Sequence, residues 1–362
     1  MQRREFVGLI AATSIASPWL KASSLADQTV TPIKNVDAPE SFTHRFAQLG
    51  SVKLHYIEEG KGPLVLLLHG IPYLWISWRH QIAALASSGY RVVAPDLRGF
   101  GQSSAPADVA DYEVLKVVGD LVALMQVLGE KSAIIVGHDL GSRVAYAAVE
   151  LRPDLFRGLV MVNSPGAPRD EFPPSASWAQ IRAKTGKRYY HDYFQTPGLP
   201  DAQMNADIRQ TLHRILVSVS GSAKGEYRWR PLLGKDETIL DTFPDSKSLP
   251  EWLPPQVFDY YVEQYKRNGF TPALNYYRCL EKNWEQTPFL SGRKLSQPAL
   301  FIGGVEDPSR EIFMPAYDAL EANLPNLPNL RKKLLLDGVG HDAMEEKPEV
   351  TNRLLLEFLP SL

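Results

Sequence analysis

The chain has 362 residues, of which 44% are hydrophobic and 22% charged, and its net charge is −2. This length suggests two domains or one large domain with an insertion, and the hydrophobic share is sufficient for a sizeable core. The balanced charge and the lack of a basic block argue against nucleic acid and anionic membrane surfaces as partners. The single cysteine, Cys279, excludes an internal disulfide, and we expect a buried, unreactive thiol there.

The amino-terminal segment 1–26 resembles a twin-arginine export signal. Arg3–Arg4 precede an apolar run over 7–16, and Ser24–Leu25–Ala26 offers a small-x-small cleavage site. The apolar run is shorter than the ~20 residues that span a bilayer. We therefore expect export to the periplasm or the outside, cleavage near Asp27, and no stable membrane anchor after processing. A membrane-anchored or unstructured start is the alternative.

Polar residues and prolines over 27–42 predict a tether, and an alternating pattern around Gly50 predicts a hairpin over 46–60. Continuous apolar runs then alternate with helical periodicity. This rhythm is typical of parallel strands, buried on both faces, that are joined by right-handed helical crossovers. The expected strands are 64–69, 91–96, 132–138, 158–163, 298–304 and 332–338, and the expected helices are 75–87, 114–129, 142–152 and 349–359.

The rhythm breaks after Ser164, where aromatic residues and prolines gather and helical patches appear over 205–219 and 257–268. An insertion that follows the carboxyl end of a strand lies over the edge of the sheet where sites form, so we expect a helical cap. The sequence therefore predicts an α/β fold with a doubly wound, mostly parallel sheet. The expected domains are a core of 43–165 and 288–362 and a cap of 166–287.

A sharp turn from a strand into a helix is predicted at Gly137–His138–Asp139–Leu140–Gly141. The pattern small-x-nucleophile-x-small is typical of a nucleophile elbow, where a strained turn exposes one side chain. Here that side chain is the carboxylate of Asp139 rather than a serine hydroxyl. Aspartate is also a favoured helix N-cap, so these five residues alone leave that alternative open.

Two further residues complete a possible triad with Asp139. His341 follows an expected strand in a glycine-rich loop, and Asp307 follows the strand that ends at Gly303–Gly304. The chain order nucleophile, acid, histidine is that of the α/β-hydrolase arrangement, and each residue lies just past the carboxyl end of a strand. We therefore predict that Asp307 orients His341, with Glu306 as the alternative acid.

The segment His69–Gly70–Ile71–Pro72 follows the first buried strand. A loop at this place supplies one oxyanion-hole N–H, and the residue after the nucleophile supplies the other. We therefore predict an oxyanion hole made by the backbone amides of Ile71 and Leu140, and a cis bond between Ile71 and Pro72.

A carboxylate nucleophile indicates a particular chemistry. With a reference pKa of about 3.9 it is already ionised near neutral pH, and it can displace a leaving group at a saturated carbon to form an ester. His341 would then activate a water that hydrolyses the ester. A halide and an epoxide oxygen both fit as leaving groups. A halide requires N–H donors, whereas an epoxide oxygen requires a proton donor such as tyrosine, whose reference pKa is near 10.

With these motifs the chain resembles the soluble epoxide hydrolases of the α/β-hydrolase superfamily. The likeness spans roughly 45–360, and as a set its stretches are far more specific than any single motif. They read "HGIPYLWISWRHQIAALASSGYRVVAPDLRGFGQSSAP", "VGHDLGSRVAY…LVMVNSP", "YYHDYFQTPG" and "ALNYYRCLEKNW…GRKLSQPALFIGGVEDP…GVGHDAMEEKP".

The resemblance implies two cap tyrosines that bind and polarise the epoxide oxygen. Tyr277, in "YYRCLEKNW", matches one of these positions. Tyr190, three residues before the tyrosine of "YFQ", matches the other, and Tyr189 and Tyr193 are close rivals.

The chain departs from its relatives beside the nucleophile. Many relatives and the haloalkane dehalogenases have tryptophan where this chain has Leu140, and fluoroacetate-type dehalogenases have arginine there. Dehalogenases also tend to have asparagine where this chain has Ile71. The missing N–H side chains favour an epoxide over a halide. Arg143, one helical turn on, is a partial substitute, with a surface ion pair as its alternative role.

The sequence thus predicts an epoxide hydrolase that forms vicinal diols through a covalent ester on Asp139. The expected partners are a small lipophilic or aryl epoxide and water, without a cofactor or a metal ion. The oligomeric state stays open. A hydrolytic dehalogenase is the enzymatic alternative, and a non-catalytic, ligand-binding homologue of the same fold is the alternative from another class.

Overall fold

The computed structural model describes residues 33, 35–245, 248–310 and 326–362. The expected export signal, 1–26, and most of the expected tether lie outside these residues. Within the described ranges, no helix combines the length and the apolar character needed to cross a membrane.

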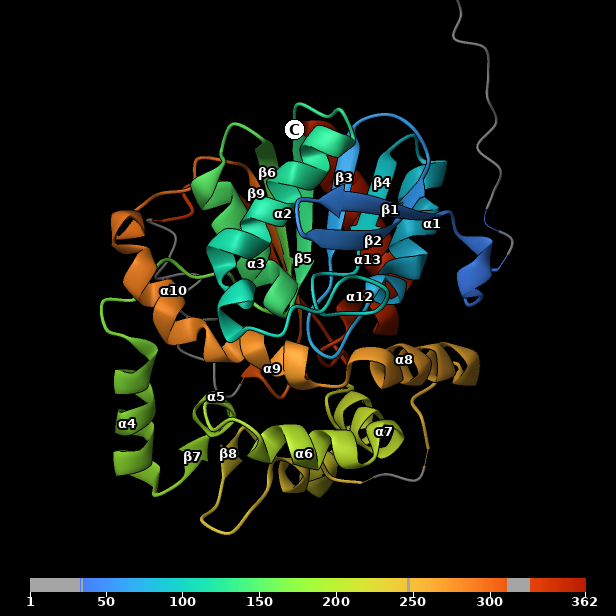
Figure 1. Ribbon diagram of the computed structural model, residues 1–362. Coiled ribbons are helices and arrows are strands. Elements are labelled where there is room, and N and C mark those ends of the chain that lie inside the picture. The colour runs from blue at the N-terminus through green and yellow to red at the C-terminus, as the bar shows by residue number, and fades with distance from the viewer. Residues whose placement is uncertain (1–32, 34, 246–247, 311–325) are drawn as a thin grey trace, which may run out of the picture. The chain divides into compact units, whose positions relative to one another are not determined.

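The described strands form a sheet of eight in the order β1-β2-β4-β3-β5-β6-β9-β10 (Figure 1). β1 pairs antiparallel with β2, and β2 pairs antiparallel with β4. Every other neighbouring pair is parallel. The bounds are β1 His44–Leu49, β2 Val52–Glu59, β3 Leu64–Leu68, β4 Arg91–Pro95, β5 Ala133–His138, β6 Phe156–Val162, β9 Ala299–Gly304 and β10 Leu330–Leu336.

The predicted hairpin and the doubly wound, mostly parallel sheet are both confirmed. Each of the six predicted apolar strands is present, with ends within two residues of the expected ones. The physical reason is burial on both faces, since all five side chains of β3 are at most 1% exposed. A strand in this position has no solvent face, so its sequence is an apolar run rather than an alternation.

The order of the strands reverses at β3. The chain runs from β3 to β4 on one side and later returns to β5 on the other side, so β3 lies between them. The loops that leave β3 and β5 therefore start side by side, with Leu68 of β3 paired to Gly137 of β5. Such a reversal point is where open α/β sheets place their ligand sites.

Helices cover both faces of the sheet. α2 packs against α3, and α1 packs against α13, and Figure 1 shows these two pairs on opposite faces of the sheet. The predicted helix over 75–87 begins with a 3-10 turn, Trp75–Trp78. The bounds are α1 Arg79–Ser87, α2 Val114–Val127, α3 Leu140–Leu151, α12 Ala343–Glu346 and α13 Pro348–Phe358.

The segment between β6 and β9 is mainly helical and lies at the carboxyl ends of the parallel strands (Figure 1). It also contains a short two-stranded sheet, β7 with β8. The bounds are α4 Pro174–Thr185, β7 Arg188–Tyr189, α5 Tyr190–Phe194, α6 Leu199–Ala206, α7 Ile208–Ser218, β8 Leu232–Leu233, α8 Pro255–Asn268, α9 Thr271–Arg278 and α10 Leu280–Gln286.

One helix of this cap differs from the prediction. The periodic stretch 205–219 is divided between the end of α6 and the whole of α7. Asp207 separates them, because its backbone is extended and its side chain accepts a hydrogen bond from the amide of Gln210 at 3.0 Å. An aspartate in this conformation caps a new helix rather than continuing the old one.

The described end of the expected tether packs on the core. The Phe42 ring lies 5.0 Å from that of Trp75, centroid to centroid. Asp37 accepts a hydrogen bond from Nε of the buried Arg79 at 2.8 Å. These contacts tie residues 37–42 to the 3-10 turn Trp75–Trp78 and to the start of α1.

Candidate active site

Asp139 occupies a strained turn between β5 and α3. Its φ is 52°, a left-handed conformation that residues other than glycine rarely adopt. Glycines make this turn possible, because a Cβ on Gly141 would lie 2.3 Å from the carbonyl oxygen of Leu68. A Cβ on Gly70 would lie 2.4 Å from that of Asp139. The turn therefore has the form of the predicted elbow and aims the Asp139 carboxylate into the pocket.

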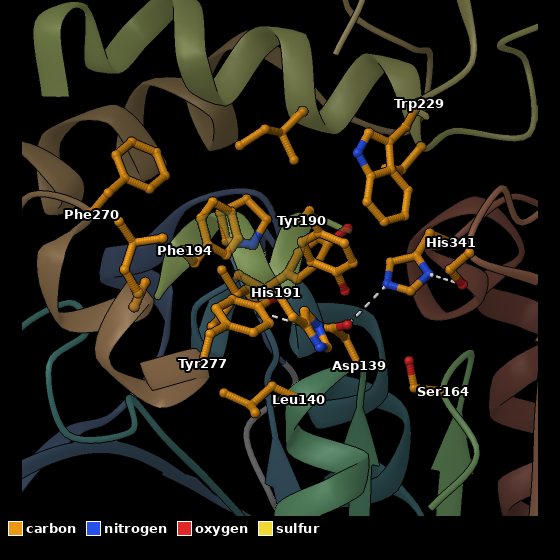
Figure 2. Close-up of a pocket in the computed structure, with 18 of the residues that line it drawn as sticks. Asp139, Leu140, Ser164, Tyr190, His191, Phe194, Trp229, Phe270, Tyr277 and His341 are labelled. Carbon is orange, nitrogen blue, oxygen red and sulfur yellow. Dashed lines mark hydrogen bonds and ion pairs between the residues drawn. The ribbon is translucent and has the colours of Figure 1, made fainter. Parts of the chain in front are cut away.

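The structure brings the three residues of the predicted triad together. Nδ1 of His341 lies 2.9 Å from Oδ2 of Asp307, and Nε2 of His341 lies 3.4 Å from Oδ2 of Asp139. Figure 2 shows the contact between His341 and Asp139 as a dashed line. Asp307 is 1% exposed, and the Asp139 side chain keeps 20% of its surface open. His341 thus lies between a buried acid and a carboxylate that a ligand can reach.

The alternative acid, Glu306, points elsewhere. Its carboxylate forms an ion pair with Lys224 at 2.9 Å, and its side chain is 31% exposed. Of the two carboxylates after β9, Asp307 is the one that contacts His341.

The Asp307 carboxylate is held by several donors. Its Oδ1 accepts hydrogen bonds from the amide and the hydroxyl of Ser309, at 2.9 and 2.6 Å. Its Oδ2 accepts one from Nδ2 of Asn163 at 3.0 Å, in addition to that from His341. These donors fix the plane of the carboxylate and hence the direction in which His341 is oriented.

One predicted amide of the oxyanion hole contacts Asp139 directly. The Ile71 N–H donates a hydrogen bond to Oδ1 of Asp139 at 2.9 Å, and the Ile71–Pro72 bond is cis, as predicted. Leu140 is the first residue of α3 and lines the same pocket. The role of its amide stays a prediction.

The backbone of His341 is fixed on two sides. Its amide donates to the carbonyl of Val219 in the cap at 2.9 Å, and its carbonyl lies 2.7 Å from Nε2 of the buried His138. The carboxylate of Glu346 accepts hydrogen bonds from the amides of Gly340 and of Gly221, both at 2.8 Å. The His341 loop is therefore bonded both to the elbow strand and to the cap segment 219–221.

The pKa values of Asp139 and His341 move in opposite directions. Burial favours the neutral carboxyl of Asp139, but the hydrogen bond and charge of His341, with the Ile71 amide, outweigh burial and lower the pKa. Burial alone would lower the pKa of His341, but Asp307 and Asp139 outweigh it and raise the pKa well above 6.5. Both shifts favour an ionised Asp139 beside a protonated His341.

Tyr190 and Tyr277 both line the pocket above Asp139 (Figure 2). Their ring centroids lie 5.8 Å apart. Burial is the main reason that the pKa of each phenol is raised well above 10, and the charge of Asp139 adds to it. Both side chains therefore stay protonated and can donate a hydrogen bond to a ligand.

The two rival tyrosines lie elsewhere. The Tyr193 hydroxyl donates to Oε1 of Gln203 at 2.9 Å, and Arg188 covers its ring. Tyr189 packs against Tyr190, with ring centroids 4.7 Å apart, and the residues that line the pocket do not include it.

The rest of the described pocket wall is largely apolar. Leu140 lies on it beside the nucleophile, and Arg143 lies on it one turn along α3. The aromatic and aliphatic side chains that the cap contributes include Phe194, Met204, Ile215, Val219, Trp229, Phe243, Phe270, Ala273, Leu274 and Leu280. Such a wall binds an apolar ligand and leaves few polar groups near the reacting atoms.

Three residues of the site were not singled out from the sequence. Asn163 and Ser309 bond the acid, and His191 lines the pocket with its ring centroid 4.8 Å from that of Tyr277. The spacing Asp-x-Ser after β9 is a signal for the Ser309 contact, because serine two residues on can bond an aspartate carboxylate. Asn163 and His191 carry no local signal.

No group of three or more His, Cys, Asp or Glu in the described part of the chain is arranged to hold a metal ion. Cys279 is buried, as expected from the sequence.

Comparison with known proteins identifies close relatives. The family model described as the alpha/beta hydrolase fold matches residues 63–348. Epoxide hydrolase A of Mycobacterium tuberculosis is 35% identical to the chain over 323 residues, which cover 88% of this chain and 98% of that protein.

Solved structures give the same result. An epoxide hydrolase from an endophytic Streptomyces is 38% identical and superposes with a TM-score of 0.83, covering 88% of this chain and 95% of that one. Epoxide hydrolase A from Mycobacterium thermoresistibile is 35% identical with a TM-score of 0.81, covering 88% of this chain and 98% of that one.

Proposed function

Since the chain belongs to the epoxide hydrolases of the α/β-hydrolase fold, we propose that it converts epoxides to vicinal diols through an ester on Asp139. The observation that carries this mechanism is an ionised carboxylate on a strained elbow, with Nε2 of His341 3.4 Å from its Oδ2. Two protonated tyrosines line the same pocket. The apolar wall supports a lipophilic or aryl epoxide as substrate.

The first step forms the ester. Oδ2 of Asp139 attacks one ring carbon, and the bond from that carbon to the ring oxygen breaks. The ring oxygen takes up the electron pair and a proton from Tyr190 or Tyr277, whose high pKa keeps the proton available. The Ile71 amide already bonds Oδ1 at 2.9 Å, which leaves Oδ2 as the attacking atom.

The second step releases the diol. Alkylation removes the negative charge of Asp139, so one of the two groups that raise the pKa of His341 is lost and that pKa falls. The imidazolium can then give its proton to the tyrosinate left by the first step, which makes a neutral imidazole available as the base. His341 takes a proton from water, and the hydroxide attacks Cγ of Asp139. The charge on Oδ1 is stabilised by the Ile71 and Leu140 amides, an effect worth about 3–4 kcal/mol per donor. The bond between Cγ and Oδ2 then breaks, and Oδ2 leaves with the diol and takes the second proton of the water, so Asp139 is again ionised and His341 again protonated.

The two alternative functions fit the site less well. A dehalogenase needs N–H side chains for the leaving halide, and neither Leu140 nor Ile71 has one. A ligand-binding homologue has no need of a complete triad, whereas Asp139, Asp307 and His341 are in contact here. Assays of diol released from styrene oxide and of halide released from bromoalkanes distinguish an epoxide hydrolase from a dehalogenase.

The mechanism is tested by trapping the ester. We expect His341→Gln, incubated with styrene oxide, to accumulate a covalent adduct on Asp139, because alkylation needs no base and hydrolysis does. Intact-mass and peptide mass spectrometry measure the adduct and its position.

The matched control is the double variant Asp139→Ala/His341→Gln, which should remain unmodified. An unmodified Asp139 in His341→Gln, under conditions where the wild-type protein turns the same epoxide over, would count against the ester. So would heavy-oxygen water that labels the diol rather than the enzyme in a single turnover.

A further inference from the structure

Asn163 stands at the end of β6, outside the pocket, yet it contacts both loops that carry the acid and the base. Its side chain is fully buried, and its φ of 60° places the backbone in the left-handed region. Its amide donates to the carbonyl of Ile302 in β9 at 2.8 Å. We propose that Asn163 is a positioning residue that sets the geometry between Asp307 and His341 and so controls the hydrolysis of the ester.

Both the nitrogen and the oxygen of the Asn163 side-chain amide form hydrogen bonds. Nδ2 donates to Oδ2 of Asp307 at 3.0 Å and to the carbonyl of Gly340 at 2.8 Å. Oδ1 accepts a hydrogen bond from the amide of Ala343 at 3.0 Å. One side chain thus bonds the acid itself, the residue before His341 and the second residue after it.

The contact with Asp307 also fixes the orientation of that carboxylate. Oδ1 is occupied by the two Ser309 donors, so Oδ2 is the atom left for His341. Asn163 donates to the same Oδ2 and holds it at its place. Because an amide does not titrate, this contact acts equally at every pH at which the enzyme works.

The consequence for the reaction is selective, and it rests on the proposed function. Formation of the ester uses Asp139 and the tyrosines, whereas hydrolysis uses His341 as a base oriented by Asp307. A small displacement of a general base costs far more in the step that it catalyses than in any other step. Loss of the Asn163 side chain should therefore slow hydrolysis and spare alkylation.

Asn163→Gly is the sharpest variant, because glycine adopts a φ of 60° without strain and only the side chain is lost. We expect the rate of ester hydrolysis to fall by about 10²-fold with alkylation changed by less than about threefold, so the adduct accumulates under turnover. We also expect the acid limb of hydrolysis to move to lower pH, because a loosened Asp307 raises the pKa of His341 less.

Asn163→Asp is the second variant. It keeps the volume of the side chain and the acceptor for Ala343, but it replaces the donor to Asp307 and Gly340 by an oxygen. We expect the same accumulation of adduct. Rapid-quench mass spectrometry on styrene oxide measures alkylation and hydrolysis separately, and thermal unfolding reports whether each variant is folded.

A parallel loss of both rates in the two variants, or hydrolysis equal to wild type in either, overturns the proposal. A purely structural role would lower both steps together and leave the pH limb in place. If His341→Gln also fails to form the adduct, the proposed ester mechanism has failed. If His341→Gln forms it and the Asn163 variants do not, only the role of Asn163 has failed.

Discussion

Burial has opposite consequences for two parts of the site. We call Asp139 with His341 and Asp307 the floor of the site, and Tyr190 with Tyr277 its roof. In the roof, burial alone is enough: it raises the pKa of both phenols and keeps them protonated. In the floor, burial favours a neutral Asp139 and has to be outweighed by His341 and the Ile71 amide. A proton donor needs only an apolar cap, whereas an ionised nucleophile needs partners from several loops.

This difference explains how the fold distributes the two roles. The floor residues follow β5, β9 and β10, and the Ile71 amide follows β3; the carboxyl ends of these strands meet at one edge of the sheet. The roof residues lie on short cap helices, α5 and α9, with mostly apolar neighbours. The rigid sheet thus holds the charges, and the cap supplies neutral donors and an apolar wall.

Removing the roof donors should have the largest effect. We expect Tyr190→Phe/Tyr277→Phe to slow alkylation of Asp139 by about 10²–10⁴-fold, because the ring oxygen loses its proton donors. Each single variant should show a smaller loss. Single-turnover formation of the adduct measures this step.

Tyr193→Phe is the matched control, since the Tyr193 hydroxyl bonds Gln203 outside the pocket. It should alkylate at nearly the wild-type rate. If Tyr193→Phe lost as much of the alkylation rate as the double variant, the assignment of the proton donors to Tyr190 and Tyr277 would be wrong.

Acid pH should separate the two steps in the floor. The pKa of Asp139 is lowered, so alkylation persists as the pH falls, whereas hydrolysis requires neutral His341 and slows as the imidazole is protonated. We expect more adduct on the wild-type protein at about pH 5 than at about pH 8, with hydrolysis slowing by up to about tenfold per pH unit. Quenched intact-mass spectra measure the adduct, and an adduct fraction that rises with pH would contradict this order.

Glu150, near the other end of α3, shows what burial does to a carboxyl without such partners. It is 4% exposed, its Oε1 has no hydrogen-bond partner among the described residues, and burial raises its pKa to about 8. The folded protein therefore prefers the neutral acid, while the unfolded chain ionises near its ordinary value of 4.5. The contribution of Glu150 to the free energy of unfolding is therefore lost as the pH rises from 4.5 to about 8.

We expect the smallest effect from Glu150→Gln. Because glutamine stays neutral, the variant should unfold about 2–4 °C higher than wild type at about pH 8.5, corresponding to about 1 kcal/mol. The difference should shrink toward about pH 5, where Glu150 is neutral in the fold. Thermal unfolding at both pH values measures it, and a lower melting temperature for the variant at alkaline pH would argue against the raised pKa of Glu150. Epoxide turnover should change by less than about twofold.

The sheet and the floor could be predicted from the sequence because their signals are local. An apolar run such as Leu64–Leu68 predicts a doubly buried strand, and a residue just past such a strand is expected at the carboxyl edge. Asp139, Asp307 and His341 all have this placement, so their meeting follows from strand ends alone.

The site residues of the cap could be predicted less well from the sequence, because tertiary contacts determine which side chains face the pocket. Tyr190 and Tyr193 both lie on the five-residue helix α5, and only its packing determines which of them faces the pocket. The same holds for Asn163, whose partners come from loops more than 140 residues along the chain. Only the resemblance to the epoxide hydrolases singled out Tyr190, and nothing in the sequence around Asn163 indicates its partners.

The bond between the His341 amide and Val219 has a consequence for how substrate preference can diverge within this fold. The cap is not an interchangeable module, because the residues at the end of α7 are also part of the support of the base. A chimaera that received a foreign cap would have to inherit a matching 219–221 segment to keep its histidine in place. Diversity of ligand is therefore expected to accumulate in the side chains of the remaining cap helices, while this junction stays fixed.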